Sequence, residues 1–293
     1  MSSESRIDGE TKLCCLIGKP VHHSISPQIH NEAYQHLGLN YVYVAFEVEE
    51  GKLDAAVAGL RALGASGLNV TIPHKTSVIR LLNEVDSEAS KIGAVNTVIH
   101  RDGQLTGYNT DVDGVEFAFT GSGVSTREKR VAVVGAGGAA RAVIASMARS
   151  GCVEISCLNR TQERAQRLAK EARKKWNVDV SVAPLNVANL KRYIGEAEIV
   201  VNATSLGMHP KVDETPIPKR FITENHTVFD VVYTPIETRF LAEAKERGAK
   251  TIGGLDMLVG QALRAFELFT GSKAPQNVMR NAAFSALGVK DEG

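Results

Sequence analysis

Apolar and polar segments alternate along the first third of the chain in a pattern typical of an α/β protein. Short apolar runs predict buried strands, and the longer amphipathic stretches between them predict helices. The expected strands cover residues 13–18, 41–48 and 67–72, and the expected helices cover residues 27–37 and 53–63. Because helices that separate strands act as crossovers, we expect a largely parallel sheet. Ser26 is the expected N-cap of the first helix, with Pro27 at the first helical position.

The same pattern restarts at Arg130 and predicts a second α/β unit. An apolar strand at residues 130–135 leads into a helix of small residues from about Ala139. Further strands are expected at residues 153–159, 197–204 and 226–233, with helices near residues 163–174 and 237–247. Glycine, serine and charged residues at 120–129 are typical of a connector. A last helix at residues 256–270 is compatible with either unit.

Composition agrees with two domains and argues against several classes of protein. A chain of 293 residues exceeds the usual size of one domain, and an apolar fraction of 43% is enough for two cores. The 34 lysines and arginines nearly balance the 33 aspartates and glutamates, so we expect no nucleic-acid partner. No apolar run reaches the ~20 residues that span a bilayer, and residues 1–12 lack the features of a signal peptide. We therefore expect a cytoplasmic protein without a membrane partner.

The cysteines and histidines do not predict a metal site. Cys14 and Cys15 are adjacent in a strand and therefore point to opposite faces of the sheet, so we expect buried, reduced thiols. Four histidines lack a cysteine or carboxylate partner at ligand spacing, namely His22, His23, His30 and His74. Packing or turn formation is the expected role of His74, which follows a proline.

Polar side chains gather where apolar segments of the first unit end. Asn69, Thr71 and Lys75 lie at the end of one expected strand, and similar polar segments follow at residues 94–97 and 107–111. A lysine, an aspartate and several amides or hydroxyls at strand ends can hold a polyhydroxylated substrate and move one proton. For any single residue of the set, capping of a turn is an alternative that stays open.

A glycine-rich turn joins the first strand and first helix of the second unit. Residues 135–140 match the pattern GxGxxA, in which Gly135 forms the tight turn and Gly137 lets the backbone approach a pyrophosphate. Ala140 allows close packing of helix and sheet, and the helix N-terminus then faces the phosphates. Because glycines also serve ordinary turns, the motif alone is weak evidence for a dinucleotide site.

The end of the next strand favours NADP over NAD. Asn159 lies 19 residues beyond Ala140, where a dinucleotide fold contacts the adenosine ribose, and an acidic residue there would select NAD. This chain instead has Asn159 and Arg160, followed by Thr161 and Arg164, and guanidinium groups suit a 2′-phosphate. The alternative is that both arginines form solvated helix pairs with Glu163 or its neighbours.

Together these motifs resemble those of the shikimate dehydrogenase family. The resemblance runs from Ile17 to about Phe284 and rests on eight motifs in family order: HSISPQIHN, NVTIPHK, GAVNT, GYNTD, GAGGAAR, NRT, NATSLGM and GGLDMLVGQ. It implies an NADP-dependent enzyme that reduces 3-dehydroshikimate to shikimate, with hydride from NADPH, in chorismate and aromatic amino acid biosynthesis. The implied partners are small molecules only, and the implied assembly is a monomer or homodimer.

The resemblance also implies roles for individual residues. Lys75 and Asp111 correspond to the catalytic pair, with Lys75 moving the proton and Asp111 orienting the lysine and the hydroxyl. The implied substrate-binding residues are Ser24, Ser26, Asn69, Thr71, Asn96, Tyr233 and Gln261. The implied cofactor-binding residues are Gly135, Ala136, Gly137, Gly138, Ala139, Asn159, Arg160, Thr161, Arg164, Val231, Gly254 and Met257. Ser24 and Ser26 would hold the substrate carboxylate at the N-terminus of the helix that they precede.

The family's domain organisation is implied as well. A substrate domain of mainly parallel α/β structure would comprise residues 1–112 and 255–293, and a Rossmann-like NADP domain would comprise residues 113–254, with a cleft between them. Two alternatives stay open, a quinate/shikimate dehydrogenase of broader specificity and a non-catalytic NADP-sensing protein. A more remote alternative is a methylenetetrahydrofolate dehydrogenase. Within the resemblance, Ser26 and Gln162 favour shikimate and NADP.

Overall fold

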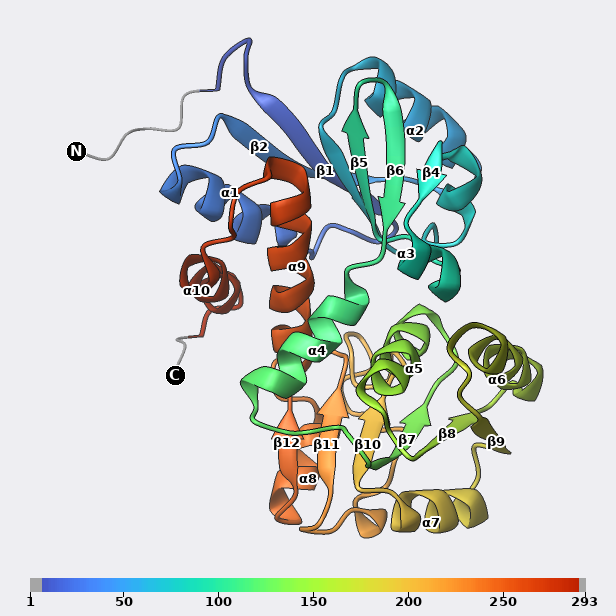
Figure 1. Cartoon of the computed structure of the whole chain (residues 1–293). Helices are drawn as coiled ribbons and strands as arrows, with labels where there is room; N and C mark the ends of the chain where they lie inside the picture. The colour runs from blue at the N-terminus through green and yellow to red at the C-terminus, as the bar shows by residue number, and fades with distance from the viewer. Residues whose placement is uncertain (1–6, 290–293) are drawn as a thin grey trace. The chain divides into compact units, whose positions relative to one another are not determined.

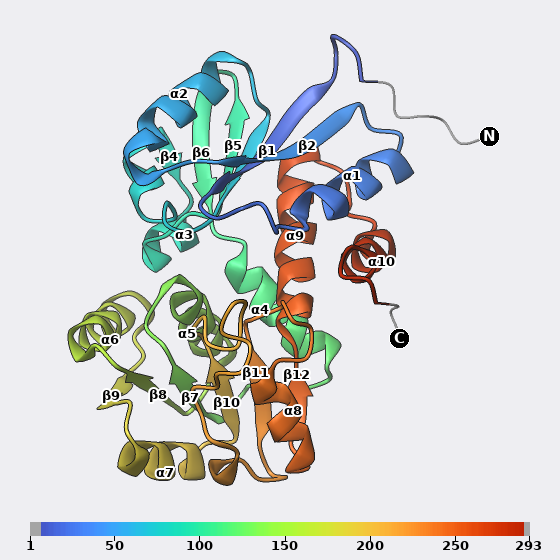
Figure 2. The same cartoon turned by 180° about the vertical axis from the view of Figure 1, so that it is seen from behind.

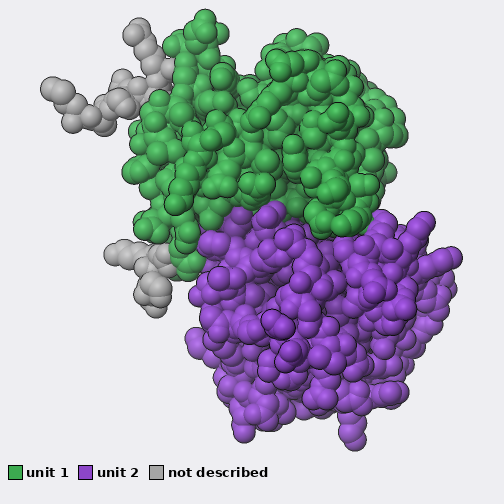
Figure 3. Space-filling view, in the orientation of Figure 1, with its two compact units in different colours: residues 1–110, 261–293 green, residues 111–260 purple. Residues whose placement is uncertain are grey.

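The computed structural model describes residues 7–289 and divides the chain into two compact units (Figure 3). The first unit comprises residues 1–110 and 261–293, and the second comprises residues 111–260. The sequence placed the boundaries two and six residues away, after residues 112 and 254. A helix already begins at Asp111, and the second boundary falls inside a helix that begins at Gly254. Residues 1–6, which belong to the segment considered for a signal peptide, lie outside the described part.

The first unit alternates strands and helices until its last two strands, which follow each other directly. Its elements are β1 (Lys12–Gly18), α1 (Ser26–His36), β2 (Tyr41–Glu47), η1 (Glu50–Lys52), α2 (Leu53–Ala62), β3 (Gly67–Val70), η2 (Ser77–Leu81), β4 (Glu84–Val85), α3 (Ser87–Ile92), β5 (Thr97–Arg101), β6 (Gln104–Tyr108), the second half of α9 (Gly254–Thr270) and α10 (Gln276–Ala286). The expected N-cap at Ser26 is wrong by one residue. Helix α1 starts at Ser26, and Ser24 Oγ accepts the hydrogen bond from the Ser26 amide at 3.3 Å.

The strands of the first sheet lie in the order β2-β1-β3-β5-β6-β4 (Figure 1). Strands β1, β2 and β3 are parallel, whereas β5 is antiparallel to both β3 and β6. The hairpin between β5 and β6 turns at Asp102 and Gly103, which both have positive φ angles of 50° and 74°. An Asp-Gly pair favours this two-residue turn. The sequence-based expectation missed this hairpin, so the segment at residues 94–97 is the start of a strand and not its end.

Apolar residues cover both faces of the first sheet. One face packs against α2, η2 and α3 through alternate strand residues such as Cys15, Ile17 and Leu68. The opposite face carries an aromatic cluster in which His30 and Tyr43 stack with ring centroids 4.4 Å apart, beside Phe266 and Phe269. Cys14 and Cys15 are both buried and unpaired, which confirms the expectation of reduced thiols.

The second unit is a regular alternation of strands and helices. Its elements are α4 (Asp111–Gly121), β7 (Arg130–Val134), α5 (Gly138–Ser150), β8 (Glu154–Asn159), α6 (Gln162–Trp176), β9 (Val180–Pro184), α7 (Val187–Glu196), β10 (Ile199–Asn202), η3 (Lys219–Phe221), β11 (Thr227–Asp230), α8 (Arg239–Glu246), β12 (Lys250–Ile252) and the first half of α9. Helices α4 and α7 and strands β9 and β12 had no counterpart in the sequence-based expectation.

The second sheet is wholly parallel, in the order β12-β11-β10-β7-β8-β9. Counted along the chain from β7, this is the order 3-2-1-4-5-6 of a doubly wound dinucleotide-binding fold, which confirms the expected Rossmann-like domain. Helices α5 and α6 cover one face of the sheet, and α7 and α8 cover the other (Figures 1 and 2). The order changes direction between β7 and β10, so the carboxyl ends of these strands mark the expected ligand position.

Two features of the described residues 7–289 bear on the class of protein. None of the helices in this range is long and apolar enough to cross a membrane. Within the same residues, histidine, cysteine and acidic side chains form no group of three or more that could hold a metal ion.

Candidate active site

Three polar segments of the first unit meet at one edge of its sheet. Asn69 near the end of β3 pairs in register with Thr97 at the start of β5, and Thr97 pairs with Tyr108 at the end of β6. Because β5 is antiparallel to its neighbours, its first residues lie at the same edge as the last residues of β3 and β6. The sequence anticipated these polar positions, and the antiparallel strand explains how they come together.

Asn69 is held by three hydrogen bonds within the sheet. Its Oδ1 accepts from the hydroxyl of Tyr43 at 2.7 Å, and its Nδ2 donates to Thr97 Oγ1 at 3.0 Å and to the backbone oxygen of Asn96 at 3.2 Å. Both amide hydrogens are therefore used inside the protein. Asn69 is 6% exposed, so these contacts make it part of the framework behind the site.

Asn96 and Thr110 form the next layer of the same network. Asn96 Oδ1 accepts from the backbone amide of Thr110 at 2.7 Å, and Asn96 Nδ2 donates to Thr110 Oγ1 at 3.0 Å. Thr97 Oγ1 also donates to Asn96 Oδ1 at 3.0 Å. The sequence-based site lacked Tyr43, Thr97 and Thr110. Thr110 stood within a motif that had been singled out, whereas the role of Tyr43 depends on strand pairing.

The backbone around Lys75 is fixed from both sides. Thr71 to His74 form a turn around the cis Ile72-Pro73 bond, closed by a hydrogen bond of 2.9 Å from the His74 amide to the Thr71 oxygen. The Lys75 oxygen accepts from the Val95 amide at 2.7 Å. The buried His74 ring makes a 2.7 Å hydrogen bond with the Val48 oxygen, as expected for packing and turn chemistry. The Lys75 side chain remains partly exposed.

Ser24 and Ser26 lie together at the start of α1. Their hydroxyl oxygens are 3.2 Å apart, and Ser26 is 8% exposed while Ser24 is more open. The first amides of a helix have no partner within the helix, and its N-terminus carries a partial positive charge. Two hydroxyls at this position can therefore donate to a carboxylate.

Of the remaining predicted residues of the catalytic and substrate sets, Asp111 and Gln261 lie at the boundaries between the units, and Tyr233 lies within the second unit. Asp111 is the first residue of α4, is 6% exposed, and directly follows Thr110 of the network. Tyr233 lies beyond the end of β11 in the second unit, where burial raises the pKa of its hydroxyl. Gln261 is partly buried in α9 and is the first residue of the carboxyl-terminal part of the first unit.

The glycine turn of the second unit has the geometry of a phosphate cradle. Gly135 has a φ of +116°, and a Cβ atom there would lie 2.7 Å from the backbone oxygen of Ala203, so only glycine fits. Gly137 is the N-cap of α5, and a Cβ atom there would meet nothing within 4 Å. The backbone at Gly137 to Ala139 is thus open to a ligand at a helix N-terminus, and these residues fit the pyrophosphate of a dinucleotide.

The residues after β8 are open and carry two arginines. Asn159 Nδ2 donates to the Thr161 oxygen at 2.7 Å, which shapes the turn into α6. Arg160 and Arg164 are exposed. The ion pairs of α6 within the described residues join Glu171 to Arg141 and Lys175, and Arg173 to Asp179. Pairing of Arg160 or Arg164 with Glu163, the alternative from the sequence, is not among these ion pairs.

Val231, Gly254 and Met257 lie together at the opposite side of the second sheet. Val231 and Met257 belong to one apolar cluster, and Met257 is 8% exposed. A Cβ atom at Gly254 would lie 2.5 Å from the Val231 oxygen, so α9 begins in direct contact with the end of β11. Met257 is consequently part of the apolar core of the second unit.

Family comparisons cover both units. The model of the shikimate dehydrogenase substrate binding domain matches residues 16–98, that of shikimate / quinate 5-dehydrogenase matches residues 119–225, and that of the shikimate 5′-dehydrogenase C-terminal domain matches residues 254–284. The shikimate dehydrogenase (NADP(+)) of Moorella thermoacetica is 44% identical over 288 residues, which are 98% of each chain.

The chain belongs to the shikimate dehydrogenase family. Solved structures agree with this assignment. A shikimate dehydrogenase in complex with NADP+ has a TM-score of 0.91 and 42% identity, covering 96% of this chain and 98% of its own. The enzyme from Thermus thermophilus in complex with NADP(H) and shikimate has a TM-score of 0.86 and 36% identity, covering 94% of this chain and 100% of its own.

Proposed function

We propose that this protein is an NADP-dependent shikimate dehydrogenase, which interconverts shikimate and 3-dehydroshikimate. The observation that carries the proposal is the ordered edge of the first sheet, where Asn96, Thr97 and Thr110 form a buried network near the fixed backbone of Lys75. A ring with several hydroxyl groups needs such a preorganised set of amides and hydroxyls. The family assignment and the glycine turn of the second unit support NADP as the cofactor.

Substrate binding is proposed for two sets of residues. Ser24 and Ser26 would donate to the substrate carboxylate, since their hydroxyls lie at the positive end of α1. The ring hydroxyls would be bound by Thr71, Asn96, Tyr233 and Gln261. Both hydrogens of the Asn69 amide are donated inside the sheet. We propose that Asn69 orients Asn96 and Thr97 and is not itself the main contact to the substrate.

Lys75 is proposed as the residue that moves the proton. When bound, NADPH supplies hydride to the carbonyl carbon of 3-dehydroshikimate. The oxygen of that carbonyl gains negative charge as its double bond opens, and Lys75 Nζ donates one proton to it to form the hydroxyl. In the direction of oxidation the neutral amine accepts this proton. Asp111 is proposed as the carboxylate member of the pair, which orients the lysine and the hydroxyl.

NADP is the proposed cofactor. Gly135 to Ala139 would hold the pyrophosphate at the N-terminus of α5, where a helix favours negative charge. Asn159, Arg160, Thr161 and Arg164 would surround the 2′-phosphate, and the two exposed guanidinium groups suit a doubly charged ligand. Val231 and Gly254, with Met257 behind them, would face the nicotinamide half. A monomer or homodimer stays a prediction, which sedimentation of the purified protein would test. The cytoplasmic location also stays a prediction.

The proposed function is tested by absorbance at 340 nm with the purified protein. Shikimate and quinate are each combined with NADP and NAD, and the four rates are compared. We expect the highest kcat/KM with shikimate and NADP. Comparable values with quinate would indicate the broader quinate/shikimate specificity that one of the matching family models includes in its name. NADP binding without turnover would support the sensor alternative, and no turnover in any combination would overturn the proposal.

A further inference from the structure

A buried carboxylate lies at the end of β11 and takes no part in the proposed mechanism. Asp230 Oδ1 accepts hydrogen bonds of 3.0 Å from Asn202 Nδ2 and from the Val232 amide, and Oδ2 accepts one of 2.6 Å from the Thr238 hydroxyl. Burial raises the pKa of Asp230 to about 6, although these three hydrogen bonds act in the opposite direction. Keeping such a group inside the protein costs free energy, because a buried charge loses its contact with water.

Asn202, at the end of β10, connects Asp230 to the segment that follows β10. Besides donating to Asp230, its Nδ2 donates to the Leu206 oxygen at 3.1 Å, and its Oδ1 accepts from the Thr204 amide at 3.0 Å and the Thr204 hydroxyl at 2.7 Å. One fully buried side chain therefore fixes the backbone from Thr204 to Leu206. Asp230 and Asn202 together tie this segment to the end of β11 and to the start of α8.

The segments held by this pair contact the cofactor cradle. A Cβ atom at Gly135 would lie 2.7 Å from the Ala203 oxygen and 3.1 Å from Thr204 Cγ2, so the glycine turn rests on residues 203–204. Val231, between Asp230 and Val232, has its oxygen against Gly254. A shift of either segment would consequently move a wall of the cradle or the start of α9.

Strand order decides which half of a dinucleotide these segments face. The glycine turn follows β7, and the adenosine side lies at the end of β8, on one side of β7 in the sheet. Strands β10 and β11 lie on the other side of β7. A dinucleotide whose pyrophosphate rests on the glycine turn therefore extends its nicotinamide half over the ends of β10 and β11.

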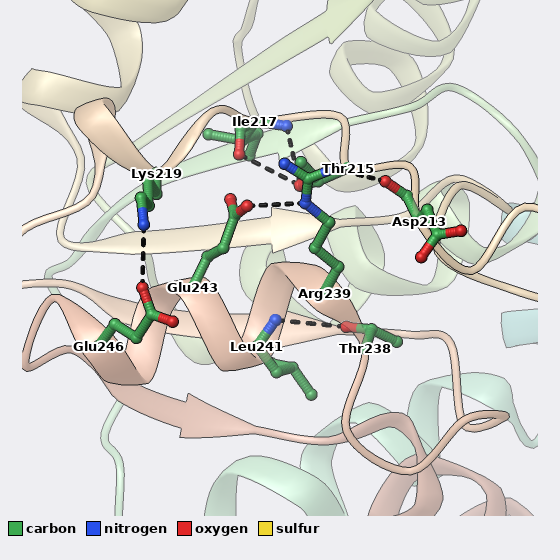
Figure 4. A network of polar contacts seen from close by, with 9 residues as sticks. All are labelled: Asp213, Thr215, Ile217, Lys219, Thr238, Arg239, Leu241, Glu243 and Glu246. Atoms are coloured by element: carbon green, nitrogen blue, oxygen red, sulfur yellow. Dashed lines mark hydrogen bonds and ion pairs between the residues drawn. The ribbon is translucent and has the colours of Figure 1, made fainter.

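The rest of the loop after β10 is anchored separately on α8 (Figure 4). Arg239 Nη1 donates to the Asp213 oxygen at 2.6 Å, and Lys219 pairs with Glu246 at 3.0 Å. These contacts are exposed and lie outside the segments at the strand ends. Thr238 joins the two sets, because its hydroxyl accepts from the Leu241 amide at 3.3 Å and donates to Asp230. The exposed anchors provide a matched control for the buried pair.

We propose that Asp230 and Asn202 are a positioning pair for the nicotinamide half of the cofactor, acting through the backbone of residues 203–206 and 231–232. This inference rests on the proposed use of NADP. It assigns the buried carboxylate a role in geometry, since Oδ1 accepts from Asn202 and from the Val232 amide, and Oδ2 accepts from Thr238 at the start of α8. The adenosine half should be insensitive to the pair.

Direct binding to two ligands tests the proposal. The ligands are NADP and 2′,5′-ADP, which contains the adenosine 2′-phosphate half without nicotinamide, and calorimetry gives Kd for both. We expect Asn202→Ala to raise the Kd of NADP about tenfold, because buried hydrogen bonds are lost. The Kd of 2′,5′-ADP should stay within about twofold of the wild-type value. Lys219→Ala, the control on the same loop, should change neither value.

A conservative variant separates geometry from charge. In Asp230→Asn the side-chain oxygen can keep the bonds from Asn202 and Val232, and the new amide can donate to Thr238 Oγ1. We expect this variant to bind NADP within about threefold of the wild-type Kd. Asp230→Ala should instead weaken NADP binding as much as Asn202→Ala does.

The outcomes are distinct. Equal weakening of NADP and 2′,5′-ADP in Asn202→Ala would overturn the proposal, because it would show a general disturbance of the second unit. Unchanged NADP binding in Asn202→Ala would also overturn it. If Asp230→Ala does not fold, Asn202→Ala and Asp230→Asn still decide the question. Failure of the wild-type protein to bind NADP would instead contradict the proposed function.

Discussion

The hydroxyl of Tyr43 donates a 2.7 Å hydrogen bond to the side-chain oxygen of Asn69. The two residues lie two strands apart, on β2 and β3, so the tyrosine spans β1 to reach the polar edge of the sheet. Tyr43 is itself fixed by Asn31, whose side chain bonds the Tyr43 amide and oxygen at 2.8 and 2.9 Å. The aromatic core of the first unit is thereby connected to the network around Asn96.

Tyr43→Phe should lower both stability and activity. The change removes one hydroxyl and leaves Asn69 Oδ1 without this buried donor, which costs about 1–3 kcal/mol of unfolding free energy. Urea denaturation measures this loss, and the KM for shikimate should rise because Asn69 orients Asn96 and Thr97. Tyr41→Phe is the control, since Tyr41 lies on the same strand but is partly exposed. Equal stability of both variants would show that the Tyr43 hydroxyl contributes nothing.

Two glycine substitutions should separate folding from cofactor binding. Gly135→Ala places a Cβ atom 2.7 Å from the Ala203 oxygen at a φ of +116°. This variant should therefore have a lower melting temperature and weaker NADP binding. Gly137→Ala has open space around its Cβ atom, so its melting temperature should stay near wild type while the methyl group obstructs the pyrophosphate. Thermal unfolding and calorimetry check both. Unchanged NADP affinity in Gly137→Ala would contradict the proposed cradle.

The raised pKa of Asp230 predicts a pH dependence of stability. The value rises from 3.8 to about 6, so the folded state keeps a proton that the unfolded state has already released between these pH values. Stability contributed by this group is therefore lost as the pH rises from 4 to 6. Asp230→Asn should gain stability relative to wild type over this range by up to about 3 kcal/mol and level off above it. Urea denaturation from pH 4 to 7.5 measures the difference, and a constant difference would contradict the assignment.

Arg160→Ala should change the choice of cofactor. The exposed guanidinium is proposed to contact the 2′-phosphate, which NAD lacks, so the variant should lose roughly tenfold or more in kcat/KM with NADP. The value with NAD should change much less. Lys170→Ala, which removes an exposed lysine of the following helix α6, is the control. Equal losses with both cofactors would show that Arg160 does not distinguish them.

Local patterns in the sequence predicted much of the fold. The apolar runs of β7, β8, β10 and β11 and the glycine turn at Gly135 depend on neighbouring residues, and they appear where expected. Strand β12 has only three residues, and only two of the five residues of β9 are buried, so neither forms a clear apolar run. The hairpin at Asp102 and Gly103 did carry a local signal, which the interpretation as a parallel sheet overlooked.

The sequence could predict which residues form the site, but it could not predict the hydrogen bonds that join them. Asn69, Asn96 and Lys75 could be selected because they end or precede apolar segments. The bond between Tyr43 and Asn69 joins residues 26 positions apart, and it depends on β1 lying between β2 and β3. That arrangement is a property of the tertiary structure, so the sequence pattern could not distinguish Asn69 as a framework residue from Asn96.

The most direct test of the account is the turnover of Lys75→Ala with shikimate and NADP, measured by absorbance at 340 nm. The control is Lys52→Ala, which removes an exposed lysine of η1. If Lys75 moves the proton, kcat should fall roughly 100-fold or more while KM for shikimate changes much less, and Lys52→Ala should match the wild type. A near-normal kcat with a raised KM would contradict the account, because Lys75 would then only bind the substrate.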